Sequence, residues 1–544
     1  MKTPDALASL ALAAAVTVAA GATARGDVVW GDFETGTAPG FGALTNSGVQ
    51  PWTAPVAGNV ITAPSGALAG SKVLELTGSA SFNFGQANGG ALGFDFLSQN
   101  LRSAFLANDQ IEFDWYPTPD PTTSAGFSQL YNVILNSAGG GFVNVDGYSA
   151  GNANLNQYYY TGYNGILHHV VVNYAAYKAT ILASATPDGG NYLQLGIQPN
   201  AGGGAPADYY FDNFKFSIAP NVWNVDADGT WSNDGNWLPA SPTAAGKVAS
   251  FGPAITAPRT VTLDAPRTVG QLLFNNANAY TIAGSSALTL DGTGSVAITV
   301  SNGSHAVTAP LSLAKDANIT VGAAGSTLTL SALQPSAVAI TKAGAGVLAV
   351  NNVRAGSLTV NAGQVRVQAN GSATGVSTVA SVSVGAGSAL DVTNNKLIVT
   401  TAGSTGSWTG TAYTGVAGMV AAGRNGGAWN GSGITTSSAT AGSNLTTLAT
   451  GKVGDFKNVA DAATTTFAGQ TVHGSDTVVM YTYGGDANLD GKINIDDYGR
   501  IDGHVSIAGS TGWYNGDFNY DGKINIDDYG IIDSNIGSQS VPLA

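Results

Sequence analysis

The sequence predicts a mainly β protein assembled from several modules, and three observations support this prediction. First, the 544 residues exceed the roughly 150 expected of one domain, so three or four modules are expected. Second, short runs of alternating apolar and polar residues recur between Gly, Asn, Pro and Ser turns, as in strands that bury one face. Third, only 10% of the residues are charged, whereas Gly contributes 74. Gly-rich β structure is therefore expected everywhere except at the C-terminal end, where a small helical unit is predicted.

Residues 1–24 have the features of a secretory signal peptide. Lys2 precedes an apolar stretch, and Ala22-Thr23-Ala24 is a small-residue cleavage pattern. We therefore expect an exported protein, extracellular or on the surface of a bacterium. A membrane-spanning helix needs about 18 consecutive apolar residues, and no later apolar run is that long. We therefore expect no membrane-spanning segment. The net charge is −14 with only 20 Lys and Arg, which argues against a nucleic-acid partner.

Residues 27–218 contain regularly spaced short strand patterns, which predict a sandwich or barrel. Gly31-Asp-Phe-Glu-Thr-Gly36 and Tyr210-Phe-Asp-Asn-Phe-Lys-Phe216 resemble the first and last strands of jelly-roll carbohydrate-binding modules. The resemblance implies a jelly-roll sandwich with one structural Ca²⁺ held by Glu34 and Asp212. Sugar rings stack on aromatic faces, so a polysaccharide is the expected ligand. The aromatic candidates for that contact are Trp115, Tyr116, Tyr158, Tyr159 and Tyr160.

An enzymatic alternative rests on Glu112-Phe-Asp114, which would put two carboxylates on one face of a strand. A laminarinase-like jelly-roll glycosidase would add a second Glu three residues after the Asp, but Pro117 occupies that position. We therefore expect a salt-bridged strand pair and no catalytic residue. A polysaccharide-degrading enzyme and a purely structural surface or adhesion protein remain the alternatives.

Residues 221–400 continue with period-2 runs such as Thr260-Val-Thr-Leu263 and Thr327-Leu-Thr-Leu330, joined by small residues. Irregular short β repeats of this kind predict a β-solenoid. Ile340 to Val350 and Gly356 to Val365 resemble the autotransporter-associated β-strand repeat, which implies a passive spacer. Residues 401–483 form a β-rich connecting region without assigned chemistry. That region resembles the segment that joins such arrays to dockerin-like ends in large exported planctomycete proteins.

The strongest signal is a duplication, because Asp490-Gly-Lys-Ile-Asn-Ile-Asp-Asp-Tyr-Gly499 recurs as Asp521 to Gly530. Each copy completes a twelve-residue EF-hand-type loop, in which positions 1, 3, 5, 7, 9 and 12 direct oxygens at a hard cation. The expected ligands of two Ca²⁺ are Asp486, Asn488, Asp490, Lys492, Asn494 and Asp497, and Asp517, Asn519, Asp521, Lys523, Asn525 and Asp528. The two Lys would contribute main-chain carbonyls. Asp instead of Glu at position 12 predicts weaker or differently shaped coordination.

Residues 484–536 resemble the type I dockerin module, which implies calcium-dependent folding and docking onto a cohesin-like or cell-surface protein. Positions 10 and 11, which usually carry hydroxyl residues in that family, are Ile495-Asp496 and Ile526-Asp527 here. Anchoring and a calcium-stapled terminal cap therefore both remain open. We expect Ile493 and Ile524 to pair the two loops. We also expect glycines in the following segments to weaken their helices, and residues 537–544 to form a tail.

Overall fold

The structure is a computed structural model. It describes residues 28–34, 41–43, 60–63, 68, 70–77, 92–96, 100–117, 127–137, 141–146, 167–178, 193–202 and 208–543. The predicted signal peptide lies outside these residues. The chain divides into two compact units, Met1–Ala219 and Pro220–Ala544, and each is described by itself. None of the helices in the described part of the chain has the length and apolarity needed to cross a membrane.

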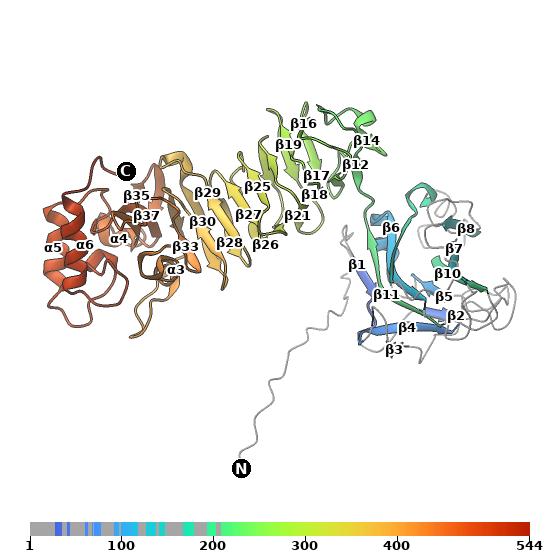
Figure 1. The fold of residues 1–544 in the computed structure, drawn as a ribbon, viewed down its shortest axis with the longest axis horizontal. Coiled ribbons are helices and arrows are strands. Elements are labelled where there is room, and N and C mark those ends of the chain that lie inside the picture. The colour runs from blue at the N-terminus through green and yellow to red at the C-terminus, as the bar shows by residue number, and fades with distance from the viewer. Residues whose placement is uncertain are drawn as a thin grey trace, which may run out of the picture. The chain divides into compact units, whose positions relative to one another are not determined.

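The first unit is a sandwich of two antiparallel sheets (Figure 1), as predicted. The first sheet has the order β3 (Val60–Thr62), β4 (Lys72–Thr77), β11 (Asp208–Ser217), β6 (Gln110–Pro117) and β9 (His168–Asn173), with β1 (Val28–Gly31) also paired to β11. The second has the order β2 (Phe41–Ala43), β5 (Leu92–Asp95), β10 (Leu193–Gly202), β7 (Phe127–Ser137) and β8 (Gly141–Asp146). Two short helices, α1 (Arg102–Ala107) and η3 (Ala175–Tyr177), complete the described part of this unit.

Strand alternation builds the sandwich core. Along β6, Ile111, Phe113 and Trp115 are fully buried in a cluster shared with side chains of β5, β7, β10 and β11. Trp30 lies in this cluster, with ring centroids of four Phe side chains 4.2–5.6 Å from its own. Because successive side chains of a strand point to opposite faces, Glu112 of the same strand faces away from this core.

The second unit is a β-solenoid of about seven turns, which confirms the predicted central fold. Its largest sheet has the order β14 (Trp237–Leu238), β12 (Asn221–Trp223), β15 (Val248–Phe251), β18 (Gln271–Asn275), β21 (Val296–Asn302), β24 (Ala317–Val321), β26 (Ala339–Ala343), β28 (Arg354–Val360), β30 (Ser377–Val384), β32 (Lys396–Val399), β37 (Thr477–Tyr483) and β34 (Thr446–Lys452). From β12 through β15 to β32, neighbouring strands are parallel.

Two further parallel sheets form the other sides of the rungs. One has the order β13 (Gly229–Thr230), β16 (Arg259–Thr262), β19 (Tyr280–Ala283), β22 (His305–Val307), β25 (Thr327–Leu330), β27 (Val347–Val350), β29 (Gln364–Val367), β31 (Ala389–Asp391) and β33 (Gly433–Thr435). The other consists of β17 (Arg267–Val269), β20 (Leu288–Leu290) and β23 (Leu311–Leu313). Short 3-10 helices lie at Asp234–Asn236, Ala373–Gly375 and Asn425–Gly427.

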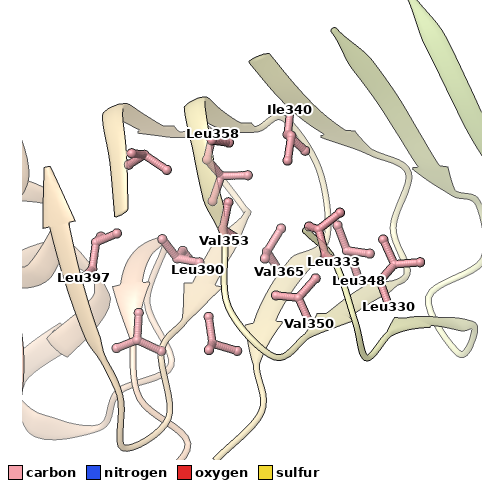
Figure 2. Packing of buried hydrophobic residues seen from close by; sticks show 14 of the residues in the cluster. Leu330, Leu333, Ile340, Leu348, Val350, Val353, Leu358, Val365, Leu390 and Leu397 are labelled. Carbon is pink, nitrogen blue, oxygen red and sulfur yellow. The ribbon is translucent and has the colours of Figure 1, made fainter. Parts of the chain in front are cut away.

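In-register apolar side chains fill the solenoid interior (Figure 2). Leu348, Val365 and Leu390 are register partners on successive rungs, and all three are buried. At the corners the rungs approach so closely that only glycine fits. A Cβ on Gly363, whose φ is +69°, would lie 2.4 Å from the carbonyl oxygen of Gly346. Both the positive φ and this close approach require glycine at position 363.

One buried charge interrupts the apolar interior. Lys342 is fully buried, and its ammonium donates hydrogen bonds to the carbonyl oxygens of Ala343, Gly344 and Ala362 at 2.7, 2.7 and 3.1 Å. Burial lowers the pKa of Lys342 to about 8. The three acceptors match the three donors of an ammonium group, so Lys342 joins neighbouring turns.

Residues 401–483, called the solenoid end below, are an integral part of the solenoid rather than a connector. Here β37 pairs antiparallel with β32, and β34 pairs antiparallel with β37, so both continue the largest sheet. The solenoid end also contains β33, α3 (Gly415–Arg424), α4 (Val453–Lys457) and the hairpin of β35 (Thr464–Phe467) and β36 (Gln470–His473). One hydrophobic cluster extends from Trp223 to Ile532. The hydrophobic core therefore continues across the predicted boundary between residues 483 and 484.

Candidate metal centre

Residues 484–536, called the C-terminal module, follow β37 directly and contain both predicted loops. Helices α5 (Ile495–His504) and α6 (Ile526–Ile536) begin inside the loops, each with a capping box. In the first, Asn494 Oδ1 accepts from the Asp496 amide at 2.7 Å, and Asp497 Oδ2 accepts from the Asn494 amide at 2.9 Å. Positions 9 and 12 of each loop thus cap a helix. Both helices form with these caps despite their glycines, and the expected weakening by the glycines stays a prediction.

The two loops have the same internal hydrogen bonds. Asp486 accepts from the amides of Asp490 at 3.1 Å and Gly491 at 2.9 Å, while Asn488 Oδ1 accepts from the Asp490 amide at 2.9 Å. The second loop repeats this pattern at positions 31 residues later, with distances of 3.1, 2.9 and 2.8 Å. Gly491 and its counterpart Gly522 have φ of +89° and +79°, a conformation that favours glycine.

An approximate two-fold relationship unites the loops and helices. The Tyr498 hydroxyl donates to Asp533 at 2.5 Å, and the Tyr529 hydroxyl donates to Asp502 at 2.5 Å. Equivalent positions of the two copies are 31 residues apart, so each copy donates from its Tyr to the same Asp position of the other, as in a self-complementary interface.

The main chain of Ile493 pairs with Gln539 rather than with Ile524, although both Ile side chains pack in the same hydrophobic cluster. The Gln539 side chain accepts from the Ile493 amide at 2.7 Å and donates to the Ile493 carbonyl at 2.6 Å. The loops are therefore joined through their helices and through the predicted tail, whose Leu543 amide also donates to the Gly491 carbonyl at 2.8 Å.

The first and last carboxylates of both loops, those of Asp486, Asp497, Asp517 and Asp528, are each 0% exposed. Burial raises the pKa of Asp486 to about 7, and the charges of Asp497 and Asp490 add to this effect. Burial likewise raises the pKa values of Asp497 and Asp528 to about 6. Among the described residues none of the four forms a salt bridge. The module therefore buries four carboxylates that have no salt-bridge partner in the described part of the chain.

The donor chemistry of the loops fits a hard cation. Each loop provides three carboxylates and two Asn amide oxygens, with no His or Cys among its ligand positions. Oxygen-only donors suit Ca²⁺ rather than zinc. Within the part of the chain that the structure describes, no three His, Cys, Asp or Glu side chains are gathered tightly enough to hold an ion by themselves. The Asn amides and a main-chain carbonyl would therefore have to complete each coordination shell.

Side chains of the solenoid end bind the second loop directly. The Tyr413 hydroxyl donates to the Asp517 carboxylate and accepts from the Gly512 amide at 2.7 Å. Arg424 donates to the Asn519 carbonyl at 3.2 Å, and the Tyr520 hydroxyl donates to a β34 carbonyl at 2.9 Å. Sequence reasoning missed Tyr413 and Arg424, because no local motif connects them to a loop about 100 residues later.

The first loop is also attached to the solenoid end. Thr482 of β37 donates to the Asp486 carboxylate, while Trp513 Nε1, within the C-terminal module, donates to the Asp486 carbonyl at 2.7 Å. The Asn535 amide of α6 donates to the carbonyls of Asn444 and Gly484, both at 2.9 Å. Both loops are therefore fixed to the solenoid end.

In the first unit, Glu34 and Asp212 lie close enough for their charges to interact. Asp212 is buried, and burial raises its pKa to about 7. The hydrogen bond from the Asn213 amide lowers this pKa, whereas the negative charges of Glu34, Asp114 and Asp32 raise it further. Glu34 accepts from the Lys72 amide at 3.1 Å. A structural Ca²⁺ at this position stays a prediction.

Two of the predicted sugar-stacking rings belong to the core. Trp115 is 0% and Tyr116 3% exposed, and they pack beside Tyr209 and Tyr210 with centroid distances of 6.2 and 6.0 Å. The predicted ligand role of these two rings is wrong, because their faces are already occupied by the protein. The Tyr158 to Tyr160 run lies outside the described residues.

Glu112 and Asp114 share one face of β6, as predicted, and both contact His169. The distances are 3.0 Å from His169 Nε2 to Glu112 and 2.7 Å from Nδ1 to Asp114, with Lys215 also 3.0 Å from Glu112. Although burial raises the pKa of Glu112, hydrogen bonds from Ser217, Lys215 and His169 hold it below its ordinary value. A carboxylate held ionised by two basic groups is not poised as a general acid.

Sequence reasoning missed a row of buried amides on the face of the second sheet opposite the core. Asn132 and Asn136 of β7 and Gln194 of β10 are buried, although Val133 and Leu135 between them point into the core. Asn136 Nδ2 donates to Gln194 Oε1 at 3.1 Å. Gln194 Nε2 has no hydrogen-bond partner among the described residues. The alternation of Asn with Val, Ile and Leu in β7 is the signal that could have found this row.

Comparisons with known proteins add one distant likeness. No protein-family model and no curated protein sequence matches the chain. One solved structure, the X-ray crystal structure of a non-crystalline cellulose specific carbohydrate-binding module (CBM28), is similar at 18% identity with a TM-score of 0.21. The match covers 34% of this chain and 92% of that chain. A likeness at that TM-score carries no inference about the ligand of this chain.

Proposed function

We propose that this chain is an exported, non-catalytic modular protein whose C-terminal module binds two Ca²⁺ and caps the β-solenoid. The observation that carries the proposal is the set of four buried carboxylates without salt bridges, arranged in two equivalent loops. Buried charges without ionic partners are costly, and a bound cation in each loop would compensate them.

The capping role follows from the attachment of both loops to the solenoid end. A solenoid has a repetitive core and open sheet edges, which require a terminal cap. Asp486, Asp517 and the Asn519 carbonyl all receive hydrogen bonds from the solenoid end. When bound, Ca²⁺ supplies the positive charge, and its binding free energy then stabilises the fold of the whole end.

Calorimetric titration of Ca²⁺ into the full, metal-free chain tests the proposal. We expect two bound ions in the natural protein and none in the Asp490→Ala, Asp521→Ala double variant. The matched control is Asp496→Ala with Asp527→Ala, which removes two exposed carboxylates at position 11 of the same loops. Absence of binding at millimolar Ca²⁺ would overturn the proposal.

A docking role is the second candidate, and exposed apolar side chains favour it. Ile495 and Ile526 occupy position 10 of the two loops and are 78% and 79% exposed. Two such residues in equivalent positions suit a cohesin-like or cell-surface protein partner. Replacing both by Ser should abolish retention of the full chain on the cell surface without changing Ca²⁺ stoichiometry. Unchanged retention would leave the cap without a docking role.

Polysaccharide binding by the first unit is a further candidate, supported by the resemblance of its first and last strands to those of jelly-roll carbohydrate-binding modules. Affinity electrophoresis of the full chain in gels that contain soluble cellulose derivatives or xylan tests it. Replacing Tyr158, Tyr159 and Tyr160 by Ala should remove the retardation, whereas Asn144→Ala, at an exposed position of β8, should not. Migration unaffected by every polysaccharide would contradict this role.

A further inference from the structure

A cavity of about 410 Å³ lies where the solenoid end meets the segment between the two calcium loops. Its walls come from residues 405–417, from β34 and α4, and from the 3-10 helix η7 (Trp513–Asn515). Five aromatic side chains line it: Trp408, Tyr413, Trp513, Tyr514 and Tyr520. The proposed ion ligands do not line this cavity, so it is a separate site.

The aromatic lining is held in place before any ligand arrives. Trp513 and Tyr520 are buried, with ring centroids 5.5 Å apart. Tyr413 lies 5.1 Å from Trp408 and 6.0 Å from Tyr520. Tyr514 is covered on one side by the Arg500 guanidinium, 4.2 Å from its ring centroid. Rings fixed in this way lose little conformational entropy when a ligand binds.

Polar groups accompany the rings. Lys452, whose ammonium lies 2.5 Å from the Asp461 carboxylate, and Asp455 lie at the cavity wall, and Asn515 and Thr450 provide an amide and a hydroxyl. Thr450 is 4% exposed, and its hydroxyl has no hydrogen-bond partner among the described residues. A buried hydroxyl without a partner is costly, so a ligand that bonds to it gains affinity.

We infer that this cavity is a carbohydrate-binding site for a neutral sugar of one or two rings. Sugar rings present apolar C–H faces to aromatic side chains and hydroxyls to polar neighbours, and both kinds of group meet here. Because the Lys452 ammonium is already paired with Asp461, an acidic ligand would be repelled by Asp455, which favours a neutral ligand. The volume lies within the range of small-molecule sites, about 300–1,000 Å³.

Titration of the full, Ca²⁺-loaded chain with cellobiose, maltose and N,N′-diacetylchitobiose, followed by tryptophan fluorescence and calorimetry, tests this inference. We expect saturable binding of at least one of these sugars. Tyr514→Ala should weaken it about tenfold, since loss of a stacked ring is worth about 1.4 kcal/mol, or tenfold in Kd.

A matched pair of variants distinguishes loss of a ligand contact from a general effect on folding. Thr450→Val and Thr447→Val remove hydroxyls that are both buried and unpartnered on the same strand, but only Thr450 lines the cavity. Thr450→Val should weaken binding about three- to tenfold, the range of one hydrogen bond, and Thr447→Val should not change it.

Two results would overturn the inference. One is the absence of saturable binding of all three sugars at about 10 mM, a concentration that reveals even millimolar affinity. The other is binding that neither Tyr514→Ala nor Thr450→Val weakens, which would place the sugar elsewhere, for example on the first unit. Ca²⁺ stoichiometry should stay the same in all three variants, so failure of this inference is separable from failure of the calcium proposal.

Discussion

In the Ca²⁺-free protein, the free energy of unfolding of the second unit should fall as the pH rises from about 4 to about 7. Burial raises the pKa of Asp486 from 3.8 to about 7. Between these values the folded state holds a proton that the unfolded state has released, so each rise in pH favours unfolding. For Asp486 alone the effect is about 4 kcal/mol across this interval. Asp497 and Asp528, with pKa values of about 6, act in the same direction.

The assay is chemical unfolding of the EDTA-treated full chain at a series of pH values, followed by tryptophan fluorescence and circular dichroism. Asp486→Asn should remove the Asp486 share of the pH dependence, about 4 kcal/mol, because the amide keeps the shape without the charge. Asp496→Asn, at an exposed position of the same loop, should retain it. Saturating Ca²⁺ should stabilise the protein most at neutral pH, where the carboxylates are free to bind it. Stability that is constant or rises with pH in the metal-free protein would refute this reasoning.

Four further substitutions test other parts of the structure. Lys342→Met should lower the free energy of unfolding by about 3 kcal/mol, because it leaves three partly buried carbonyls without donors. Leu348→Ala in the solenoid core should cost about 2–5 kcal/mol. Gly522→Ala should weaken both folding and Ca²⁺ binding, since its φ is +79° and its Cβ would lie 2.2 Å from the Trp408 ring. Gly530→Ala, with no atom within 4 Å of the added methyl, should instead stabilise α6 by up to about 1 kcal/mol.

Denaturant unfolding monitored by circular dichroism measures all four effects. The matched controls are Lys315→Met and Leu238→Ala at exposed positions, which should change stability by less than about 0.5 kcal/mol. A Lys342→Met protein as stable as the natural one would contradict the bridging role of that ammonium. A destabilising Gly530→Ala would contradict the placement of this glycine on an open helix face.

The strands of the solenoid could be predicted from the local sequence pattern, but the long-range strand pairing of residues 401–483 could not. Period-2 runs such as Thr327 to Leu330 became solenoid rungs, because burying alternate side chains is a local requirement. Residues 401–483 could not be assigned in advance. Their strands β34 and β37 pair with each other and with β32 across long sequence separations, which no local signal encodes.

The candidate sites show the same division. The duplicated loops could be predicted from the spacing of their residues, because a twelve-residue calcium loop needs its turn glycine and its ligands at fixed positions. Tyr413 and Arg424, which bind the second loop, were not found, because tertiary packing alone brings them there. Trp115 was assigned to a ligand although it fills the sandwich core. Sequence alone cannot tell an aromatic side chain that stacks on a sugar from one that stacks on its neighbours.

The central claim is that calcium orders the C-terminal module and the solenoid end together. Hydrogen exchange of the full chain, measured by mass spectrometry with and without Ca²⁺, tests it most directly. We predict that Ca²⁺ slows exchange in both loops and also in α3, β34 and β37, because Tyr413, Arg424, Thr482 and Tyr520 connect them. Protection confined to residues 486–497 and 517–528, or no protection at all, would contradict the claim.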